Sequence, residues 1–346
     1  MARKKKYTAA VIGTGRIGFT LGFDKKREQP ASHTMALVKN RRVHIVAGCD
    51  TDRSRLERWA DYVGNPSCST EVSHLFATVK PEIIVIAVNE DSHLKVAMDA
   101  INARPKLIIL EKPVALNLKQ GGELKFAAEL RKVPVLVNHE RRFAEDYRIA
   151  KEYISKIGAI QTVNARLDSG LYVYNPEKEA SGEYSLLHDG THLVDIVMYL
   201  LEGNEIPKEP VLRDIKLSSV YYDKEKPEVV RNVTVHCRSD KCNDVNLFFS
   251  GRSRFFGFEV EVIGTEGRFK VGNGIFEFYT RKESKLYTGF YSLLPDKTVK
   301  RPKKTCYFSN MVKNAVDFLD GKAALKSNLQ TGLNALTVLE EIKKHL

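Results

Sequence analysis

The sequence predicts an α/β protein in two parts: a doubly wound parallel sheet, then an α/β domain with a large, mostly antiparallel open sheet. In about the first 140 residues, short runs rich in Val and Ile alternate with amphipathic stretches, as in sheets covered by helices on both faces. In the second half, strand-like runs follow one another across short turns, which is typical of antiparallel sheets. At 346 residues the chain is long enough for two domains.

Five apolar runs are the expected strands of the first part: Tyr7–Ile12, Val43–Cys49, Ile83–Val88, Leu107–Leu110 and Val133–Asn138. The segments between them that read as helices are Ser54–Val63, His93–Ile101 and Lys119–Leu130. Parallel strands buried on both faces are apolar throughout, which is why these runs do not alternate with polar residues.

The second part begins with an expected boundary near Asn138–Arg148, and Gly182–Leu201 is expected to be a helix with an apolar face. Its expected strands are Ile160–Leu167, Ile215–Tyr222, Val229–Arg238, Val245–Ser250, Phe255–Ile263 and Gly267–Val271. Two closing helices are expected near Ser309–Asp320 and Thr331–His345, and they can pack back on the first domain. We therefore divide the chain into a dinucleotide-binding domain, 1–137, and a substrate-binding and oligomerisation domain, 138–346.

Composition excludes several classes of protein. The chain is 43% hydrophobic and 28% charged, which excludes a disordered chain or a small disulfide scaffold. Its five Cys are scattered without a CxxC pair, so we expect neither disulfides nor a zinc site. We expect a cytoplasmic protein with reduced cysteines. No apolar run or signal peptide points to a membrane. The net charge of +12 is spread along the chain, so we expect no nucleic-acid partner and allow for an anionic substrate.

A glycine-rich loop follows the first expected strand: Gly13, Thr14, Gly15, Arg16, Ile17 and Gly18. In this GxGxxG spacing, Gly13 permits a tight turn and Gly15 lets the backbone approach a pyrophosphate. Gly18 lets a following helix pack closely on the strand, and the N–H groups at the start of that helix face the phosphates. The context of a strand and a βαβ pattern strengthens an otherwise weak motif, and it predicts a Rossmann dinucleotide site.

Asp50 ends the second expected strand, where an acid would bind the adenosine ribose and repel a 2′-phosphate. This favours NAD over NADP, although Arg53 and Arg55 could tolerate a 2′-phosphate. Asp50 lies 32 residues after Gly18 (50 − 18), which is longer than usual, and we attribute the excess to an insertion at Phe23–Ser32. The alternative for Asp50 is a helix cap or a turn acid.

Further motifs follow in a characteristic order. They are Asn89 with His93, Glu111-Lys112-Pro113, Asn138-His139-Glu140-Arg141-Arg142-Phe143, Gly190-Thr191-His192-Leu193-Val194-Asp195 and Val262-Ile263-Gly264-Thr265-Glu266-Gly267. Together with the glycine loop, this series resembles the glucose–fructose oxidoreductase, inositol dehydrogenase and MocA family of NAD(P)-dependent oxidoreductases. The resemblance implies a Rossmann domain, a second domain whose open sheet often forms a homodimer or homotetramer, and hydride transfer at a carbon of a sugar, sugar derivative or cyclitol.

Oxidising a secondary alcohol needs a base for the hydroxyl proton and a cation or donor for the developing alkoxide, both beside the nicotinamide. The resemblance assigns the second role to Lys112, next to Glu111, which either orients it or lies near the cofactor. It assigns the base to His192. Asn89 is a reasonable cofactor contact at the end of a strand, whereas His93 is interpreted as helix packing, and His33 carries no assignment.

The sequence departs from the family pattern beside the expected base. His188 stands where the family has an Asp four residues before the base, and the acid has moved to Asp189. Both can lie next to His192 on one helix face, and we expect them to bind substrate. His188 and His192 have HxxxH metal spacing but no acid of the HExxH type, so no metal is expected.

Arg142 follows an expected strand and is a candidate substrate contact, with a domain-interface salt bridge as the equal alternative. Two other functions stay open for the whole chain. One is an NAD-dependent glycosidase of the same fold that oxidises its substrate transiently, and the other is a non-catalytic NAD-binding sensor. Net formation of NADH would distinguish a dehydrogenase from the glycosidase, and Lys112 with His192 argues against a sensor.

Overall fold

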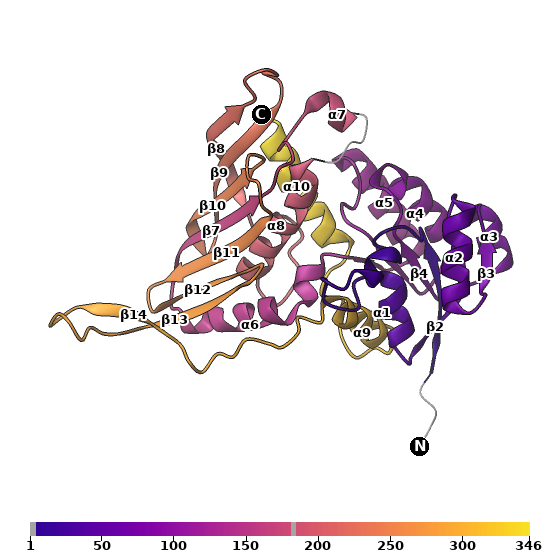
Figure 1. Cartoon of the computed structure of the whole chain (residues 1–346), viewed down its shortest axis with the longest axis horizontal. Helices are drawn as coiled ribbons and strands as arrows, with labels where there is room; N and C mark the ends of the chain where they lie inside the picture. The colour runs from indigo at the N-terminus through magenta and orange to yellow at the C-terminus, as the bar shows by residue number, and fades with distance from the viewer. Residues whose placement is uncertain (1–4, 181–184) are drawn as a thin grey trace. The chain divides into compact units, whose positions relative to one another are not determined.

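The computed structural model describes residues 5–180 and 185–346 and divides into two compact units (Figure 1). The first contains Met1–Ala144 and Lys304–Leu333, and the second contains Glu145–Lys303 and Asn334–Leu346. The units thus differ from a single boundary near residue 138, because the chain returns to the first unit at Lys304. The functional assignment of 1–137 and 138–346 stays a prediction.

The first unit is built on a six-stranded sheet with the order β3-β2-β1-β4-β5-β6, in which every neighbouring pair is parallel. The strands are β1 (Tyr7–Ile12), β2 (Val43–Cys49), β3 (Ser67–Ser69), β4 (Ile83–Ile86), β5 (Leu107–Leu110) and β6 (Val135–Val137). All four residues of β4 and of β5 are buried, as expected for central parallel strands. This order reverses between β1 and β4, the point where such sheets bind ligands.

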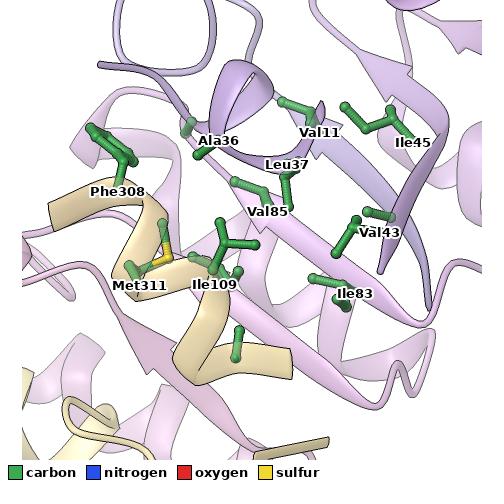
Figure 2. Close-up of a cluster of buried hydrophobic side chains, with 14 of the residues drawn as sticks. Val11, Ala36, Leu37, Val43, Ile45, Ile83, Val85, Ile109, Phe308 and Met311 are labelled. Atoms are coloured by element: carbon green, nitrogen blue, oxygen red, sulfur yellow. The ribbon is translucent and has the colours of Figure 1, made fainter. Parts of the chain in front are cut away.

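Helices cover both faces of this sheet. They are α1 (His33–Lys39), α2 (Arg53–Val63), α3 (Val72–Thr78), α4 (His93–Asn102), α5 (Leu118–Arg131) and α9 (Tyr307–Leu319). Figure 2 shows α9 placing Phe308 and Met311 beside Leu37 of α1 and beside Val85 and Ile109 of the sheet. The late segment of the chain therefore completes the core of the first unit.

The second unit is built on an eight-stranded sheet with the order β14-β13-β12-β11-β7-β10-β9-β8. Its strands are β7 (Ile160–Asp168), β8 (Arg213–Tyr222), β9 (Val230–Ser239), β10 (Cys242–Ser250), β11 (Gly257–Gly264), β12 (Gly267–Gly272), β13 (Ile275–Glu283) and β14 (Tyr291–Pro295). All neighbours are antiparallel except β7 and β10. Its helices are α6 (Glu145–Tyr153), α7 (Pro176–Ala180) and α8 (Leu186–Leu201), and α10 (Leu329–Lys343) begins in the first unit and ends here.

Buried and half-buried side chains alternate along β11, which shows which face of the sheet the helices cover. Phe258, Val260 and Val262 are buried, and α6 and α8 pack against the same sheet. The intervening Glu259 and Glu261 are half-buried and pair with Lys270 and Arg268 of β12. One face is therefore apolar and covered by helices, while the other is charged.

The predicted fold class is confirmed: a doubly wound parallel sheet and a large, mostly antiparallel one. Several elements were not expected, including the edge strand β3, the short helix α1 and the hairpin of β13 and β14. The predicted helix Gly182–Leu201 is described from Leu186, and residues 181–184 lie outside the described residues. Within the described ranges, no helix has the length and apolar character needed to cross a membrane.

Candidate active site

The glycine-rich loop has the close contacts that its spacing predicts. Gly13 has φ +90°, and a Cβ there would lie 2.4 Å from the Ala87 carbonyl oxygen. A Cβ on Gly18 would lie 2.0 Å from the Gly13 carbonyl oxygen. At Gly15, by contrast, the nearest atom would be Arg55 Nη1 at 3.6 Å. Gly13 and Gly18 are thus needed for the turn itself, and Gly15 has the clearance that this motif needs for a pyrophosphate.

The predicted continuous helix does not follow this loop, although the Phe19 N–H donates to the Gly15 carbonyl at 2.9 Å in a single helical turn. After Gly18 the chain makes turns and a 3₁₀ helix, η1 (Thr20–Phe23), and α1 begins only at His33. However, the His33 N–H donates to the Ile17 carbonyl at 3.1 Å, and the Thr34 N–H donates to Gly18 at 3.0 Å. Since helical N–H groups bond to the residue four positions earlier, His33 takes the place of residue 21. The helix is therefore interrupted by 12 residues (33 − 21) and then resumed.

This insertion accounts for the long spacing to Asp50. Subtracting 12 inserted residues from the observed 32 leaves 20, which is the usual distance from the glycine motif to the ribose-binding acid. Asp50 Oδ2 accepts from both the backbone N–H and the hydroxyl of Thr14, at 2.8 and 2.9 Å. The cap of α2 is Asp52 instead, whose Oδ1 accepts from the Arg55 N–H at 3.1 Å. Asp50 is thus attached to the dinucleotide loop and does not serve as the helix cap.

The insertion contacts the rest of the first unit at two points, Phe23 and Glu28. Phe23 packs against Phe19 and Tyr62, with ring centroids 5.0 and 5.7 Å away. Glu28 accepts hydrogen bonds from the backbone N–H groups of Thr305 and Cys306, at 2.7 and 2.6 Å, immediately before α9. These contacts make the insertion a packed part of the first unit.

Lys112 lies two residues after the end of β5 and is half-buried. Its neighbours Glu111 and Pro113 are both hydrogen-bonded to other segments of the first unit. Glu111 is buried, its N–H donates to the Ile86 carbonyl at 3.0 Å, and its Oε1 lies 2.6 Å from His33 Nε2 and 2.6 Å from Asn138 Nδ2. On the other side, His93 Nδ1 lies 2.7 Å from the Pro113 carbonyl oxygen, and the Lys112–Pro113 peptide is cis. The backbone around Lys112 is therefore held from both directions.

Burial and pairing set the protonation of these groups. Burial opposes ionisation of Glu111, but the hydrogen bond and attraction of His33, with the hydrogen bond of Asn138, hold its pKa below the usual value. Burial lowers the pKa of His93, and its bond to the Pro113 carbonyl only partly opposes this. Glu111 is thus a buried carboxylate at neutral pH, and His93 a neutral ring that donates to the backbone.

The other predicted residues of the first unit differ in their exposure to solvent. Arg16 and Asn89 are exposed, and Asn89 precedes η2 (Glu90–Ser92) after β4. Arg142 lies in η3 (Glu140–Phe143), is only 1% exposed, and donates through Nη1 to the Lys326 carbonyl at 3.4 Å. This burial favours a structural role for Arg142, and its predicted substrate contact stays a prediction.

The second unit carries the remaining candidates on α8. His188 and Asp189 lie in its first turn and His192 one turn later. His188 is buried and its Nδ1 accepts from the Ser185 N–H at 3.4 Å, while Asp189 and His192 are half-buried. A Cβ on Gly190 would lie 2.9 Å from the Phe249 ring, so this glycine lets α8 approach β10. Among residues 5–180 and 185–346, no three His, Cys, Asp or Glu side chains are grouped to hold a metal ion.

The first unit therefore brings the glycine loop, Asp50, Asn89 and the Lys112 segment to one edge of its sheet, since each follows the carboxyl end of a parallel strand. Sequence reasoning missed His33 and Asn138 as partners of Glu111, and it interpreted His93 as packing only. The His33–Glu111 pair joins residues 78 positions apart, so no local spacing could indicate it. Asn138 directly follows β6, and His93 begins the helix after β4, so their places beyond the ends of strands were the available signal.

Known proteins resemble this chain in sequence and in fold. Residues 7–139 match the family model described as "Oxidoreductase family, NAD-binding Rossmann fold". A D-glucoside 3-dehydrogenase of Escherichia coli is 26% identical over 56% of this chain and 53% of its own length. The scyllo-inositol 2-dehydrogenase (NADP(+)) IolW of Bacillus subtilis is 29% identical over 34% of each chain. The chain thus spans about half or less of the length of these relatives.

A solved structure extends the likeness to both units. The WlbA dehydrogenase from Bordetella pertussis, in complex with NADH and UDP-GlcNAcA, superposes with a TM-score of 0.73 at 16% identity. It covers 99% of this chain and 95% of its own, which shows a common fold. Residues 7–139 are thus similar to the NAD-binding Rossmann domain of the Gfo/Idh/MocA oxidoreductases, and both units share the fold of a solved dehydrogenase.

Proposed function

We propose that the chain is an NAD(P)-dependent dehydrogenase or reductase that acts on a carbinol carbon of a sugar, sugar derivative or cyclitol. NAD is preferred over NADP because of Asp50. Lys112 and His192 handle the proton, and His188, Asp189 and Arg142 bind substrate. The names of the relatives, a glucoside and an inositol dehydrogenase, support this substrate class.

The main support is that hydrogen bonds hold the backbone on both sides of Lys112. This segment lies at the same edge of the parallel sheet as the glycine-rich loop. A buried carboxylate on one side and a buried imidazole on the other hold the backbone of this residue. Fixing a catalytic group before substrate arrives removes much of the orientational part of the barrier. Such attachment has no obvious use for an ordinary surface lysine.

The residues of the first unit fit a dinucleotide. Gly15 leaves the backbone accessible, and Asp50 retains acceptor capacity beyond its bonds to Thr14 and Asp52. When bound, nicotinamide supplies the hydride acceptor or donor. The ammonium of Lys112 stabilises the alkoxide that develops on the substrate, and the imidazole of His192 takes or returns the hydroxyl proton.

The test is reduction of NAD and NADP against a panel of sugars, nucleotide sugars, uronic acids and inositols. With the best substrate, Lys112→Ala and His192→Ala should each reduce kcat by about 10²–10⁴-fold, the usual contribution of a general acid–base group. NADH affinity should change by less than about threefold, because neither change alters the glycine loop. Wild-type turnover by Lys112→Ala would overturn the mechanism.

Accumulation of NADH distinguishes this activity from the glycosidase alternative, in which the cofactor returns unchanged at the end of each cycle. His74 of α3 is exposed, and His74→Gln is the control for a histidine substitution far from the carboxyl edge of β5 and β6. Cofactor binding without turnover on any substrate would favour a sensor.

A homodimer or homotetramer through the eight-stranded sheet is part of the proposal. Its charged face and the exposed side chains of the β13–β14 hairpin support this, with Leu286, Tyr287 and Phe290 at 81%, 67% and 66% exposure. Exposed apolar side chains gathered in this way mark contact surfaces. Light scattering of the purified chain tests it, and a monomer at all concentrations would contradict it.

A further inference from the structure

Three side chains from distant parts of the first unit meet at one buried oxygen. Glu111 Oε1 lies 2.6 Å from His33 Nε2 and 2.6 Å from Asn138 Nδ2. The exposed fractions of these residues are 6% for Glu111, 0% for His33 and 2% for Asn138. A buried carboxylate is costly unless donors surround it, so both partners are required to keep it in place.

His33 reaches this oxygen because of where the interrupted helix resumes. It is the first residue of α1, and its own N–H donates to the Ile17 carbonyl of the dinucleotide loop at 3.1 Å. Its ring also packs edge-on against Phe308, with centroids 5.1 Å apart and planes at 87°. The loop and α9 therefore determine the direction of the imidazole.

The same residue thus connects two functional segments. Its backbone closes the helical turn behind Gly18, and its side chain holds the residue that precedes Lys112. Pro113 on the far side of Lys112 is attached separately, through His93. Loss of His33 would release one of the two attachments of Lys112 while leaving the other intact.

We propose that His33 is a positioning residue for Lys112, acting through Glu111. This assignment rests on the proposed role of Lys112 beside the nicotinamide. The imidazole holds the Glu111 carboxylate, which fixes the backbone from which the ammonium projects. The same link makes the placement of the ammonium depend on the helix that resumes after the insertion.

Two substitutions of nearly equal size separate the bond from the volume of the side chain. His33→Gln places its amide nitrogen where Nε2 lies and keeps a donor for Glu111. The shorter amide of His33→Asn reaches only the position of Nδ1 and cannot bridge to Glu111. His33→Asn should lower kcat by about 10–100-fold, since displacing a catalytic group by about 1 Å has effects of this size. His33→Gln should stay within about threefold of wild type, with KM and NADH affinity nearly unchanged in both.

A second measurement needs no substrate. Pyridoxal 5′-phosphate with borohydride labels accessible lysine amines, and peptide mass spectrometry reports the rate at Lys112. We expect the His33→Asn rate to differ from wild type by at least about threefold, whereas His33→Gln and the control His74→Gln retain it. A lysine whose surroundings are merely less stable would not change its labelling well below the melting temperature.

Wild-type kcat and wild-type labelling in His33→Asn would overturn the proposal, as would equal losses in His33→Gln and His33→Asn. If His33→Asn fails to fold, Glu111→Asp replaces it, because it withdraws the carboxylate from His33 by one methylene. A wild-type protein that oxidises no sugar would refute the proposed function instead, and the labelling arm would still decide the role of His33.

Discussion

Asp50 and Thr14 are joined twice, by hydrogen bonds of 2.8 and 2.9 Å from the Thr14 backbone N–H and hydroxyl to Asp50 Oδ2. Oδ1 accepts from the Asp52 N–H at 2.9 Å. An ionised carboxylate has about four acceptor positions, so three bonds leave about one for a ribose hydroxyl. The end of β2 and the turn after β1 are therefore joined at Asp50, whose remaining acceptor position is the one that the proposed function assigns to the ribose.

Asp50→Asn should weaken NADH binding more than NADPH binding. The amide loses the charge that repels a 2′-phosphate, and it cannot accept all three bonds. We expect NADH affinity to fall by about tenfold, or roughly 1.4 kcal/mol, and the NADH-to-NADPH affinity ratio to fall with it. Fluorescence titration with each cofactor measures both. Asp61→Asn, at an exposed position of α2, should change neither, and an unaltered ratio in Asp50→Asn would rule out its role in selecting NAD.

Three alanine substitutions at glycines should separate folding from cofactor binding. Gly18→Ala should cost about 1–3 kcal/mol of unfolding free energy, because its methyl group collides with the Gly13 carbonyl. Gly15→Ala meets only Arg55 Nη1 at 3.6 Å, so it should fold normally and lose NADH affinity alone. Gly122→Ala in α5 meets nothing within 4 Å and should stabilise by about 0.5–1 kcal/mol. Urea unfolding and NADH titration measure the set, and wild-type NADH affinity in Gly15→Ala would contradict the role of that backbone.

The pattern of apolar residues predicted the architecture well, because buried parallel strands are continuous apolar runs. All of β4 and β5 are apolar, and the expected ranges Ile83–Val88 and Leu107–Leu110 contain them. The polar edge strand β3, which is Ser67–Ser69, has no such pattern. Long-range pairing was equally hidden, since His33 meets Glu111 only after the sheet is assembled.

At the glycine loop, part of the structure could be predicted from the sequence and part could not. Gly13 has the positive φ and the close backbone contact of the predicted tight turn, whereas a Cβ on Gly18 would meet the Gly13 carbonyl of the same loop and not a packed helix. The insertion was predicted at Phe23–Ser32, and α1 does begin at His33, but no pattern in the sequence showed which residues of the glycine loop the helix bonds to. The bonds from His33 and Thr34 back to Ile17 and Gly18 supply that information.

Glu28 should matter for stability although it lies in the insertion. Its carboxylate accepts from the Thr305 N–H, the Thr305 hydroxyl and the Cys306 N–H, at 2.7, 3.1 and 2.6 Å. Glu28→Ala removes these bonds at the start of α9 and should cost about 1–2 kcal/mol, the range for loss of a helix cap. Fluorescence of the buried Trp59 reports unfolding of the first unit, as it is the only tryptophan in the sequence. Glu57→Ala, which removes an exposed pair with Arg53, is the control, and equal losses in both would contradict the anchoring role.

Glu111 should give the first unit a specific sensitivity to acid. Its folded pKa lies below the usual 4.5, because the hydrogen bonds of His33 and Asn138 outweigh the effect of burial. A depressed folded pKa contributes stability that is complete above the unfolded value and is lost as pH falls through the folded value. Glu111→Gln cannot titrate, and at pH 7 it should cost about 1.5–3 kcal/mol, the range for a hydrogen bond to a charged group. Its difference in melting temperature from wild type should therefore be widest above pH 4.5 and narrow below it. Melting curves followed by Trp59 fluorescence between neutral pH and about pH 3 measure this window. A difference that stays constant down to the acid end would show that Glu111 is not held as a carboxylate in the folded chain.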